Sequence, residues 1–598
     1  MRLRVAALAL TLLLALTGLL ASSDRGEAAS DELVALLRQQ PCPELAIPNP
    51  REFTQSEIDR ALKGRFVLVG ERTKIVPGRD WTSEEDAGRI FQRELHNFRW
   101  MNILLYAYNA GDRRALLQAR RIMVDWVKRN PLAGEATPPL AWMNLVAGDR
   151  AAFLGYVTRA SACEGMLPDR PAKILLDSML AHGDYFSTGG GYFESNHGLF
   201  TDLGLYLLAT RYMSFHGQAH EWAQLAESRF PQTLAGRTSS EGVWLEHSAG
   251  YQFLAIRLAE RFLSFHGPDA ATEGTLAQLK ATAPWFVAPD GKTPLIGDTE
   301  EERVDAEYRS AARQLDGMGV FPEAGFAVVR RNKRYFAALA DYHNGSHKHS
   351  DDASFELHDQ ELRVLTGAGR YGFDRTELRE FNVSAEAHNT LTVDKGEWPR
   401  DGDGAYGSGI LASGEGGSNW YAVLVRNPLT DLQGVAHTRL FLYHPRIGLV
   451  IDDKLSASAT HTYRRYLQFG QEIEVTRTGQ STLQLAAEGF SGCVQDEALN
   501  GVPSKLGLYR AKNDPLRGYY FPKQGAPVPR WTARFQSRGA TVEHLLAIGL
   551  SQGCPIRLER LAGAGILDFN LHREGRETLN ISVSQSGGSL VVTETKLP

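Results

Sequence analysis

Apolar residues recur every three or four positions through the first half of this chain of 598 residues. Two such runs cover 116–127 and 199–207. The clearest run consists of Phe91, Leu95, Phe98, Met101, Leu105 and Tyr108. A stripe of this period predicts amphipathic helices, and the short glycine and proline breaks between the runs predict stacked helical hairpins over residues 31–316. Helices paired in this way can close into a barrel or toroid.

After about Phe321 the period of the apolar positions changes to two, which is typical of half-buried strands. The stretches with this alternation are 335–342, 354–357, 362–365, 421–426, 440–443, 449–452, 545–550, 566–571 and 579–583. Many short strands with turn residues between them predict an antiparallel β-sheet domain over 321–598. The Gly- and Ser-rich stretch 402–418 is interpreted as an exposed loop. The expected fold class is therefore α+β with more than one domain.

The first 23 residues have the pattern of a secretory signal peptide. Arg2 and Arg4 precede an apolar run over 5–21, which ends in small residues. Cleavage after such a segment predicts export to the periplasm or out of the cell, whereas the alternative is a single membrane anchor. No later stretch has the length and apolar composition of a membrane-spanning helix, so no membrane partner is expected after cleavage.

Composition is that of an ordinary globular protein, with 43% hydrophobic and 23% charged residues. The formal net charge is −5. This balance argues against a nucleic-acid partner, which would require an excess of positive charge. An acidic substrate would instead need a cleft that is locally basic. The sequence does not determine an oligomeric state.

Four cysteines are spread along the chain without a CxxC motif. They are too few for a disulfide scaffold, but isolated bridges are compatible with an oxidising compartment. Pairing Cys42 with Cys163 and Cys493 with Cys554 would respect the division between the helical and strand-rich halves.

Two well-known sequence motifs occur without the secondary structure that their functions require. Residues 367–372 match GxGxxG, but the strand and helix that a dinucleotide site needs do not surround them, so we interpret them as a turn. Residues 549–553 match GxSxG, with Asp568 and His572 following, yet too little chain remains for a hydrolase sheet. Neither motif predicts a cofactor or a nucleophile.

Polar clusters stand at two predicted helix entries. The stretch 194–198 reads Glu-Ser-Asn-His-Gly, and Asn196 and His197 are candidate functional residues. The alternative interpretation is that Asn196 or Ser195 is a helix N-cap and that His197 is a surface side chain of the first turn. The stretch 246–252 brings Tyr251 to a second helix entry, where a tyrosine could equally serve as core packing.

A third cluster, over 346–357, contains His347 and His349 just before a predicted strand. If this segment is extended, both imidazoles lie on one face. Paired imidazoles indicate a metal site or catalysis more than packing, although a polar strand remains the alternative.

Taken together, the three clusters resemble the heparinase II/III-like polysaccharide lyases, which include alginate lyases. Residues 387–394 look like the family's later AHNT-type strand, and 78–81 with the following region around His96 are similar to its early helical part. The resemblance implies an incomplete (α/α) toroid followed by a stacked antiparallel β-sheet domain. This agrees with the fold class expected from the periodicity.

The resemblance implies β-elimination on a polysaccharide or oligosaccharide that contains uronic acid. Removal of the C5 proton builds negative charge on the adjacent carboxylate, which Asn196 and His347 would neutralise. Tyr251 is assigned as the acid, and also as the base when both groups leave from the same face. His197 is the base for the opposite stereochemistry. Since an ordinary tyrosine has a pKa near 10, Tyr251 would need cationic neighbours.

Many relatives in this family hold a structural metal, often zinc. His349 and His388 match two of its ligands, but Gly367 stands where the family has an aspartate and cannot ligate. A zinc site would therefore need Asp351 or Asp352 as a substitute. Otherwise the two histidines hydrogen-bond each other or nearby backbone and brace the strand. No further cofactor is expected.

Two other functions remain open from the sequence. One is a glycan-binding or processing protein that kept the fold without catalysis, which the missing aspartate would favour. The other is a glycoside hydrolase on an (α/α) barrel, which needs two carboxylates at one cleft. Glu194 and Glu246 are its candidates.

Overall fold

The computed structural model describes residues 31–42, 48, 51–82, 88–394, 396–550, 554–563 and 565–597. The predicted signal segment 1–23 lies outside these residues, as does most of the GxSxG motif. The chain divides into two compact units. The first unit comprises Met1–Leu234 with Arg261–Gly267, and the second comprises Ala235–Glu260 with Pro268–Pro598.

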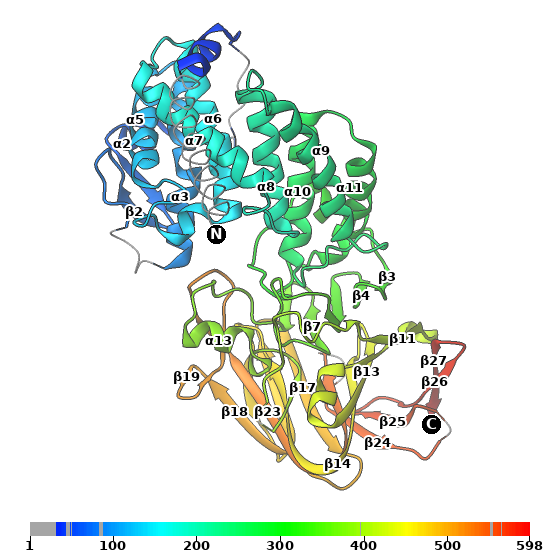
Figure 1. The fold of residues 1–598 in the computed structure, drawn as a ribbon. Helices are drawn as coiled ribbons and strands as arrows, with labels where there is room; N and C mark the ends of the chain where they lie inside the picture. Colours follow the sequence, from blue (N-terminus) through cyan, green and yellow to red (C-terminus); the bar gives the residue numbers. More distant parts are fainter. Residues whose placement is uncertain are drawn as a thin grey trace, which may run out of the picture. The chain divides into compact units, whose positions relative to one another are not determined.

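The first unit is helical apart from one β-hairpin, as the periodicity of three to four predicted (Figure 1). Its elements are residues 31–39, α2 (Gln55–Leu62), β1 (Arg65–Leu68), β2 (Glu71–Lys74), α3 (Arg89–Asn97), α4 (Asn102–Asn109), α5 (Arg113–Arg129), α6 (Asn144–Cys163), α7 (Asp169–Ser187), α8 (Asn196–Leu207), the π-helix Leu208–Tyr212 and most of α9 (Ala219–Gly236).

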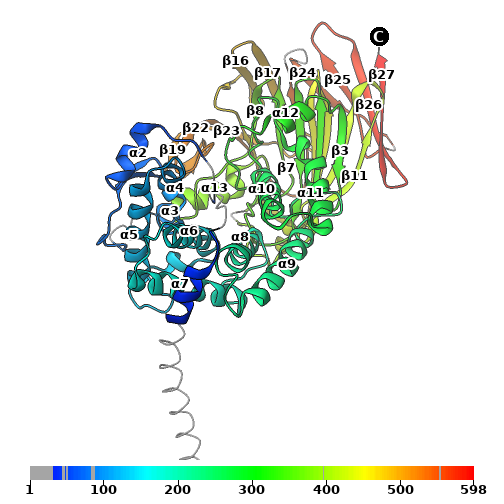
Figure 2. The ribbon, with the colours of Figure 1, turned by 90° about the horizontal axis from the view of Figure 1, so that it is seen from above.

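Helix α6 is the centre of the first unit, and Figure 2 shows it among α3, α5, α7 and α8. All its residues from Leu145 to Ser161 are buried. Glycines let α6 and α8 approach closely: a Cβ on Gly204 would lie 2.6 Å from the carbonyl oxygen of Gly148. This packing fixes the position of the first turn of α8, which carries Asn196 and His197.

The second unit begins with helices and continues as sheets. The helices are the start of α10 (Ala249–His266), α11 (Ala270–Thr282) and α12 (Ala306–Ala312), and α13 (Glu377–Val383) follows among the strands. The first strand, β3 (Gly317–Phe321), begins four residues before the expected start of the β-domain at 321. The predicted fold class, a helical N-terminal region followed by antiparallel sheets, is confirmed.

All paired strands of the three main sheets are antiparallel. The five-stranded sheet has the order β3, β4 (Phe326–Arg331), β5 (Arg334–Leu339), β7 (Ser354–Asp359), β8 (Leu362–Leu365). The ten-stranded sheet has the order β11 (Ile410–Glu415), β12 (Tyr421–Arg426), β13 (Val435–His444), β14 (Gly448–Gln468), β23 (Trp531–Gly549), β17 (Phe490–Ala498), β16 (Thr482–Ala487), β15 (Glu474–Arg477), with β9 (Leu391–Val393) on β14 and β18 (Lys505–Arg510) on β23. The four-stranded sheet is β24 (Ile556–Arg560), β25 (Leu567–Arg573), β26 (Thr578–Ser586), β27 (Ser589–Leu597).

The sheets of the second unit stack in three layers because side chains alternate along the strands of the ten-stranded sheet. On β13, Phe441 packs with Phe336 and Phe355 of the five-stranded sheet. Its neighbour Leu442 belongs to the core shared with Phe569 of the four-stranded sheet. The ten-stranded sheet is therefore buried on both faces by apolar residues.

Several strands differ from their expected extent. β14 runs for 21 residues, far beyond the predicted 449–452, because its continuation past Asp453 is largely polar and loses the apolar alternation. The stretch 402–418 is not wholly a loop, since β11 pairs with β12. Residues 367–372 follow β8 without a helix, which begins only at Glu377, as expected for a turn.

Both predicted disulfides are present. Cys42 pairs with Cys163, with Cα atoms 5.6 Å apart, and Cys493 pairs with Cys554, with Cα atoms 5.8 Å apart. The first joins the N-terminal segment to the end of α6 and the second joins two sheets of the second unit.

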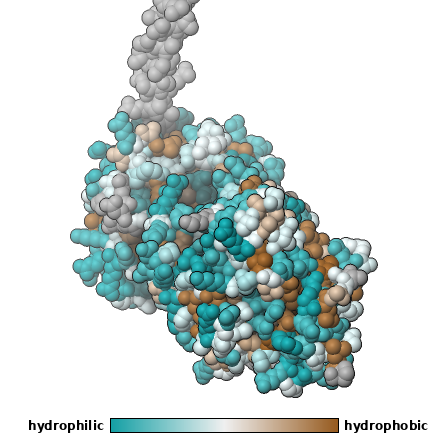
Figure 3. All heavy atoms as spheres, turned by 90° about the horizontal axis from the view of Figure 1, so that it is seen from below, coloured by the Kyte–Doolittle hydropathy of each residue, from teal (hydrophilic) through white to brown (hydrophobic). Residues whose placement is uncertain are grey.

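The surface seen in Figure 3 is mainly hydrophilic, with smaller apolar areas between. None of the helices in the described residues combines the length and apolar composition that crossing a membrane requires.

Candidate functional site

Tyr251 and His347 form a stacked pair in the second unit. Tyr251 lies in the first turn of α10, and His347 lies in the loop between β6 (Asp341–Tyr342) and β7. Their ring centroids are 3.7 Å apart and the ring planes differ by 26°. Two residues that are 96 positions apart in sequence are thus brought together, as the motif order suggested.

A buried carboxylate, Asp298, orients both histidines of the HxH motif. His347 Nδ1 is 3.2 Å from Asp298 Oδ2, and His349 Nε2 is 2.9 Å from Asp298 Oδ1. The segment lies just before β7, as predicted, but it is a loop and not extended, and the two imidazoles converge on one carboxylate instead of sharing a strand face. Since an ionised carboxylate only accepts hydrogen bonds, each of these ring nitrogens donates.

Arg379 of α13 closes this network from the other side. Its Nη1 and Nη2 donate to the two oxygens of Asp298 at 2.5 and 3.0 Å. Burial alone would raise the pKa of Asp298, but the charge of Arg379 and the hydrogen bonds of His349 and His347 hold it well below its usual range. Asp298 is therefore a fixed negative charge beneath the two imidazoles.

His247 holds the loop that presents His347. Its Nε2 accepts from the backbone N–H of His343 at 2.9 Å, and its Nδ1 donates to the carbonyl oxygen of Ser346 at 2.8 Å. Burial lowers the pKa of His247 well below its usual value, so the ring is neutral, in agreement with these bonds. His247 and His347 have positive φ angles of 56° and 58°, a strained conformation that is often found at functional sites.

Arg370 supplies positive charge near Tyr251. Its Nε donates to Glu300 Oε1 at 2.9 Å. Burial lowers the pKa of Arg370, but interaction with Tyr251 and Glu300 outweighs burial and raises it. This is the cationic neighbour that Tyr251 would need as a base.

Asp298, Arg370 and Arg379 were not predicted from the sequence. In the sequence, Asp298 is marked only by its position in the dipeptide Gly297-Asp298, which follows the apolar residues Leu295 and Ile296. A Cβ on Gly297 would lie 1.9 Å from the carbonyl oxygen of His247, so this step runs directly against the loop that carries the site.

The predicted metal ligands His349 and His388 are adjacent and buried. His349 Nδ1 is 3.1 Å from His388 Nε2, and His388 Nδ1 is 2.8 Å from the carbonyl oxygen of Ser384. Burial lowers the pKa of both histidines, that of His388 to about 3. Because His349 Nε2 donates to Asp298 and His388 Nδ1 donates to the carbonyl of Ser384, a hydrogen bond between the two rings requires a second proton on one of them.

A third ligand is missing from this pair. A Cβ on Gly367 would lie 2.0 Å from the carbonyl oxygen of Leu295, so no carboxylate fits there. The possible substitutes Asp351 and Asp352 pair instead with Lys348, at 2.9 and 3.3 Å. Across the described ranges, no three His, Cys, Asp or Glu side chains form a cluster that could hold a metal. These residues do not fit a zinc site.

Lys348 lies at the centre of a buried cluster of acids. Burial lowers the pKa of Lys348, but Asp351, Asp352 and Asp341 outweigh burial and raise it, so the ammonium stays charged. Burial raises the pKa of Asp341 well above its usual value. The residue between the two histidines is therefore an internal cation that ties their loop to the sheet core.

Asn196 and His197 begin α8 in the first unit. Ser195 is the N-cap, and its Oγ accepts from the backbone N–H of His197 at 3.1 Å, so the plainer N-cap reading applies to Ser195. Asn196 is buried. His197 Nδ1 is 2.9 Å from Asn144 Oδ1, which only accepts, so Nδ1 donates.

The two carboxylates proposed for hydrolysis differ in their surroundings. Glu246 is fully buried, with Oε2 3.9 Å from His347 Nε2, whereas Glu194 is exposed in the first unit. Because Glu246 is buried beside His347, it is placed to support this imidazole and not to contact a glycan directly.

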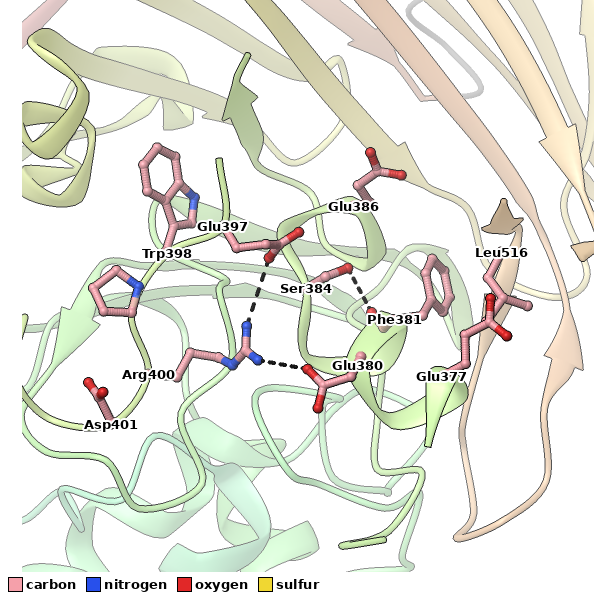
Figure 4. Close-up of a pocket in the computed structure, with 11 residues that line it drawn as sticks. Glu377, Glu380, Phe381, Ser384, Glu386, Glu397, Trp398, Arg400, Asp401 and Leu516 are labelled. Atoms are coloured by element: carbon pink, nitrogen blue, oxygen red, sulfur yellow. Dashed lines mark hydrogen bonds and ion pairs between the residues drawn. The ribbon is translucent and has the colours of Figure 1, made fainter. Parts of the chain in front are cut away.

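A cavity of about 770 Å³ lies on the other side of α13. Figure 4 shows Arg400 pointing between Glu380 and Glu397, at 3.2 and 3.8 Å, with Glu377, Glu386 and Asp401 around the same space. This excess of carboxylates disfavours an anionic polymer, so we do not assign the cavity to the substrate.

Comparison with known proteins gives a consistent result. A family model described as "Heparinase II/III-like, C-terminal" matches residues 313–515. A crystal structure of heparinase III is 15% identical, covers 96% of this chain and 97% of its own, and has a TM-score of 0.76. Heparan sulfate lyase HepC from Pedobacter heparinus is 16% identical, with coverages of 96% and 94% and a TM-score of 0.60. No curated protein sequence matches the chain.

The matched residues 313–515 contain His347, His349, Gly367 and His388, and the structural likeness extends over nearly the whole chain. The resemblance read from the three polar clusters is thereby confirmed: the chain carries a heparinase II/III-like C-terminal domain and has the fold of heparinase III.

Proposed function

We propose that this protein is a polysaccharide lyase that cleaves a uronate-containing anionic glycan by β-elimination. The fold supports a lyase of the heparinase type. The observation that carries the proposal is the stacked pair of Tyr251 and His347, with Asp298 below the imidazole and Arg370 near the phenol. Acid, base and cationic groups of this kind are what elimination next to a carboxylate requires.

In this proposal Tyr251 takes the C5 proton and returns a proton to the leaving O4 when both groups leave from one face of the sugar. The positive charge of Arg370 favours the phenolate that takes the C5 proton and that forms again when O4 is protonated. Glu300 holds Arg370 through its Nε, which keeps the guanidinium from swinging away.

Charge on the substrate carboxylate is neutralised by His347 in the same proposal. Asp298 accepts from Nδ1 of His347, so His347 neutralises the substrate carboxylate only as the imidazolium, whose Nε2 then also donates. Asn196 as a second donor, and His197 as base for the opposite stereochemistry, stay predictions from the sequence. The hydrogen bond to Asn144 favours the neutral tautomer of His197 that carries its lone pair on Nε2, and a base needs such a lone pair.

Export to the periplasm or the medium is part of the proposal. The N-terminal pattern of Arg2, Arg4 and the apolar run supports it, and so do the two disulfides, which persist in oxidising compartments. A uronate polymer outside the cytoplasm would then be the substrate, with no cofactor assigned.

The test is an assay of the mature protein on alginate, heparan sulfate and other uronate polymers. A lyase creates an unsaturated sugar, whose ultraviolet absorbance rises, together with new reducing ends. A hydrolase yields reducing ends without that rise, and a glycan-binding protein yields neither. Absence of the rise on every uronate polymer would reject the proposal.

A further inference from the structure

A second cavity, of about 430 Å³, lies wholly within the first unit. It is built by α2, the β-hairpin and the segment from α3 to α4, and none of the candidate catalytic residues lines it. Its charged and aromatic lining consists of Arg51, Arg60, Arg65, Arg99, Glu57, Glu94, Phe53, Phe66 and Trp100. The volume is in the range of small-molecule sites.

Three arginines at this cavity lack an acidic partner. Arg51, Arg60 and Arg65 are exposed and make no ion pair with any described residue. Six other arginines of the same unit do form ion pairs with described acidic residues, namely Arg38, Arg99, Arg113, Arg114, Arg129 and Arg229. Since Glu57 and Glu94 belong to the same lining, four arginines face two carboxylates, and the cavity carries a net positive charge on a chain whose net charge is −5.

The two carboxylates at the cavity offset part of this positive charge, although their hydrogen bonds go to neutral groups. Glu57 Oε2 accepts from the backbone N–H and the hydroxyl of Thr54, at 2.8 and 2.7 Å, and these bonds lower its pKa. Glu94 Oε1 accepts from Asn97 Nδ2 at 3.1 Å. Arg99 is paired with Asp149 at 2.5 Å, so the fourth arginine adds little net charge.

The aromatic floor of the cavity is preformed. The rings of Phe66 and Trp100 meet edge to face with centroids 4.6 Å apart, and Trp100 Nε1 donates to the carbonyl oxygen of Leu95 at 3.1 Å. Arg51 lies over the ring of Phe53 at 5.3 Å. Phe66 and Trp100 are themselves buried, at 4% and 9% exposure, so they fix the shape of the cavity while the three arginines offer their guanidinium groups to a ligand.

We infer that this cavity binds a saccharide unit that carries a carboxylate or sulfate group. A guanidinium donates two parallel hydrogen bonds to such a group, and aromatic rings accept the apolar face of a sugar. The choice of a saccharide rests on the proposed function, while the preference for an anion rests on the arginines alone. The site would hold part of an anionic glycan without taking part in its cleavage.

Binding of tetrasaccharides by isothermal titration calorimetry tests this inference. The probes are a heparan sulfate tetrasaccharide, an oligomannuronate tetramer and neutral cellotetraose, applied to Tyr251→Phe so that cleavage does not interfere. We expect Arg60→Gln/Arg65→Gln in that background to weaken binding of an anionic tetrasaccharide by more than about tenfold or to remove one binding event, because charge-assisted hydrogen bonds are lost. Cellotetraose should show no dependence on these arginines.

The matched control is Arg121→Gln, which removes an exposed arginine of α5 that does not line the cavity. Made in the Tyr251→Phe background, Arg121→Gln should bind the anionic tetrasaccharides as Tyr251→Phe alone does. A circular dichroism melt should show that all variants are folded. The inference is overturned if the double variant binds like its parent, if Arg121→Gln loses as much affinity, or if the parent binds neither anionic probe. Loss of affinity in the double variant supports the cavity even if no uronate polymer is cleaved, which separates this inference from the proposed function.

Discussion

The carboxylate of Asp298 contacts the imidazole of His347 at 3.2 Å while Arg379 holds both of its oxygens. Asp298 thereby sets which nitrogen of His347 donates and where the ring stands against Tyr251. The chemistry assigned to the HxH motif depends on a residue 49 positions earlier in the chain.

Removing the phenol hydroxyl should stop catalysis without unfolding the protein. For Tyr251→Phe we expect a loss of about 10²–10⁴-fold in kcat, the usual contribution of an acid-base group. The ring keeps its stacking on His347, so the melting temperature should stay close to that of the wild type. Initial rates of the absorbance rise on a cleaved polymer measure the effect. A variant with full activity would show that Tyr251 is not the acid or base.

Breaking the Asp298–Arg379 pair should destabilise the second unit. Asp298→Asn leaves the Arg379 guanidinium, whose side chain is 15% exposed, without its counter-charge, and we expect a loss near or below the lower end of the about 3–5 kcal/mol that a fully buried pair costs. Arg379→Met alone should lower the free energy of unfolding by a similar amount. The double variant Asp298→Asn/Arg379→Met should lower it by less than the sum of the two single losses. Urea unfolding of the four proteins gives this double-mutant cycle. Additive losses would mean that the two residues are not coupled.

Restoring the family's aspartate should not create a zinc site. Gly367→Asp and Gly367→Ala both place a Cβ against the carbonyl oxygen of Leu295, and overpacking of this kind costs about 1–3 kcal/mol. Both should lower the melting temperature, and elemental analysis should show no gain of zinc in Gly367→Asp. Gly274→Ala is the control, because a Cβ there meets nothing within 4 Å. Stoichiometric zinc in a stable Gly367→Asp protein would contradict the crowding argument.

Stability should fall in mild acid because of buried histidines in the first unit. Burial lowers the pKa of His96 to about 3, with Arg150 adding to the shift, whereas an unfolded histidine has a pKa near 6.5. Below pH 6.5 the unfolded chain takes up the proton first, so this contribution is complete above that pH and is lost as the pH falls toward 3. Between pH 7 and 5.5 the loss from His96 is about 1 kcal/mol.

Urea unfolding at both pH values measures this loss. His96→Gln should lose about 1 kcal/mol less than the wild type over the same interval. His220→Gln is the control, because this side chain on α9 is exposed in the folded protein as in the unfolded chain. Equal pH dependence in His96→Gln and the wild type would show that His96 is not the source.

The order of helices and strands was readable from the sequence because apolar periodicity is a local property. Periods of three to four and of two gave the helical first part and the antiparallel sheets, and β12 was predicted with its observed bounds. Where a strand is polar on its outer end, as in β14, the same signal was lost and the strand was predicted too short.

Motif order also predicted Tyr251, His347, His349 and His388 as candidate functional residues, and pairing the cysteines within each half of the chain gave the two disulfides that the structure has. What only the tertiary structure decided is which groups surround them. Asp298, Arg370 and Arg379 reach the motif through contacts between distant segments, and the carbonyl oxygen of Leu295 closes the position of Gly367 to a carboxylate. No local pattern encodes such contacts, because they arise from how loops of different strands and helices pack against one another.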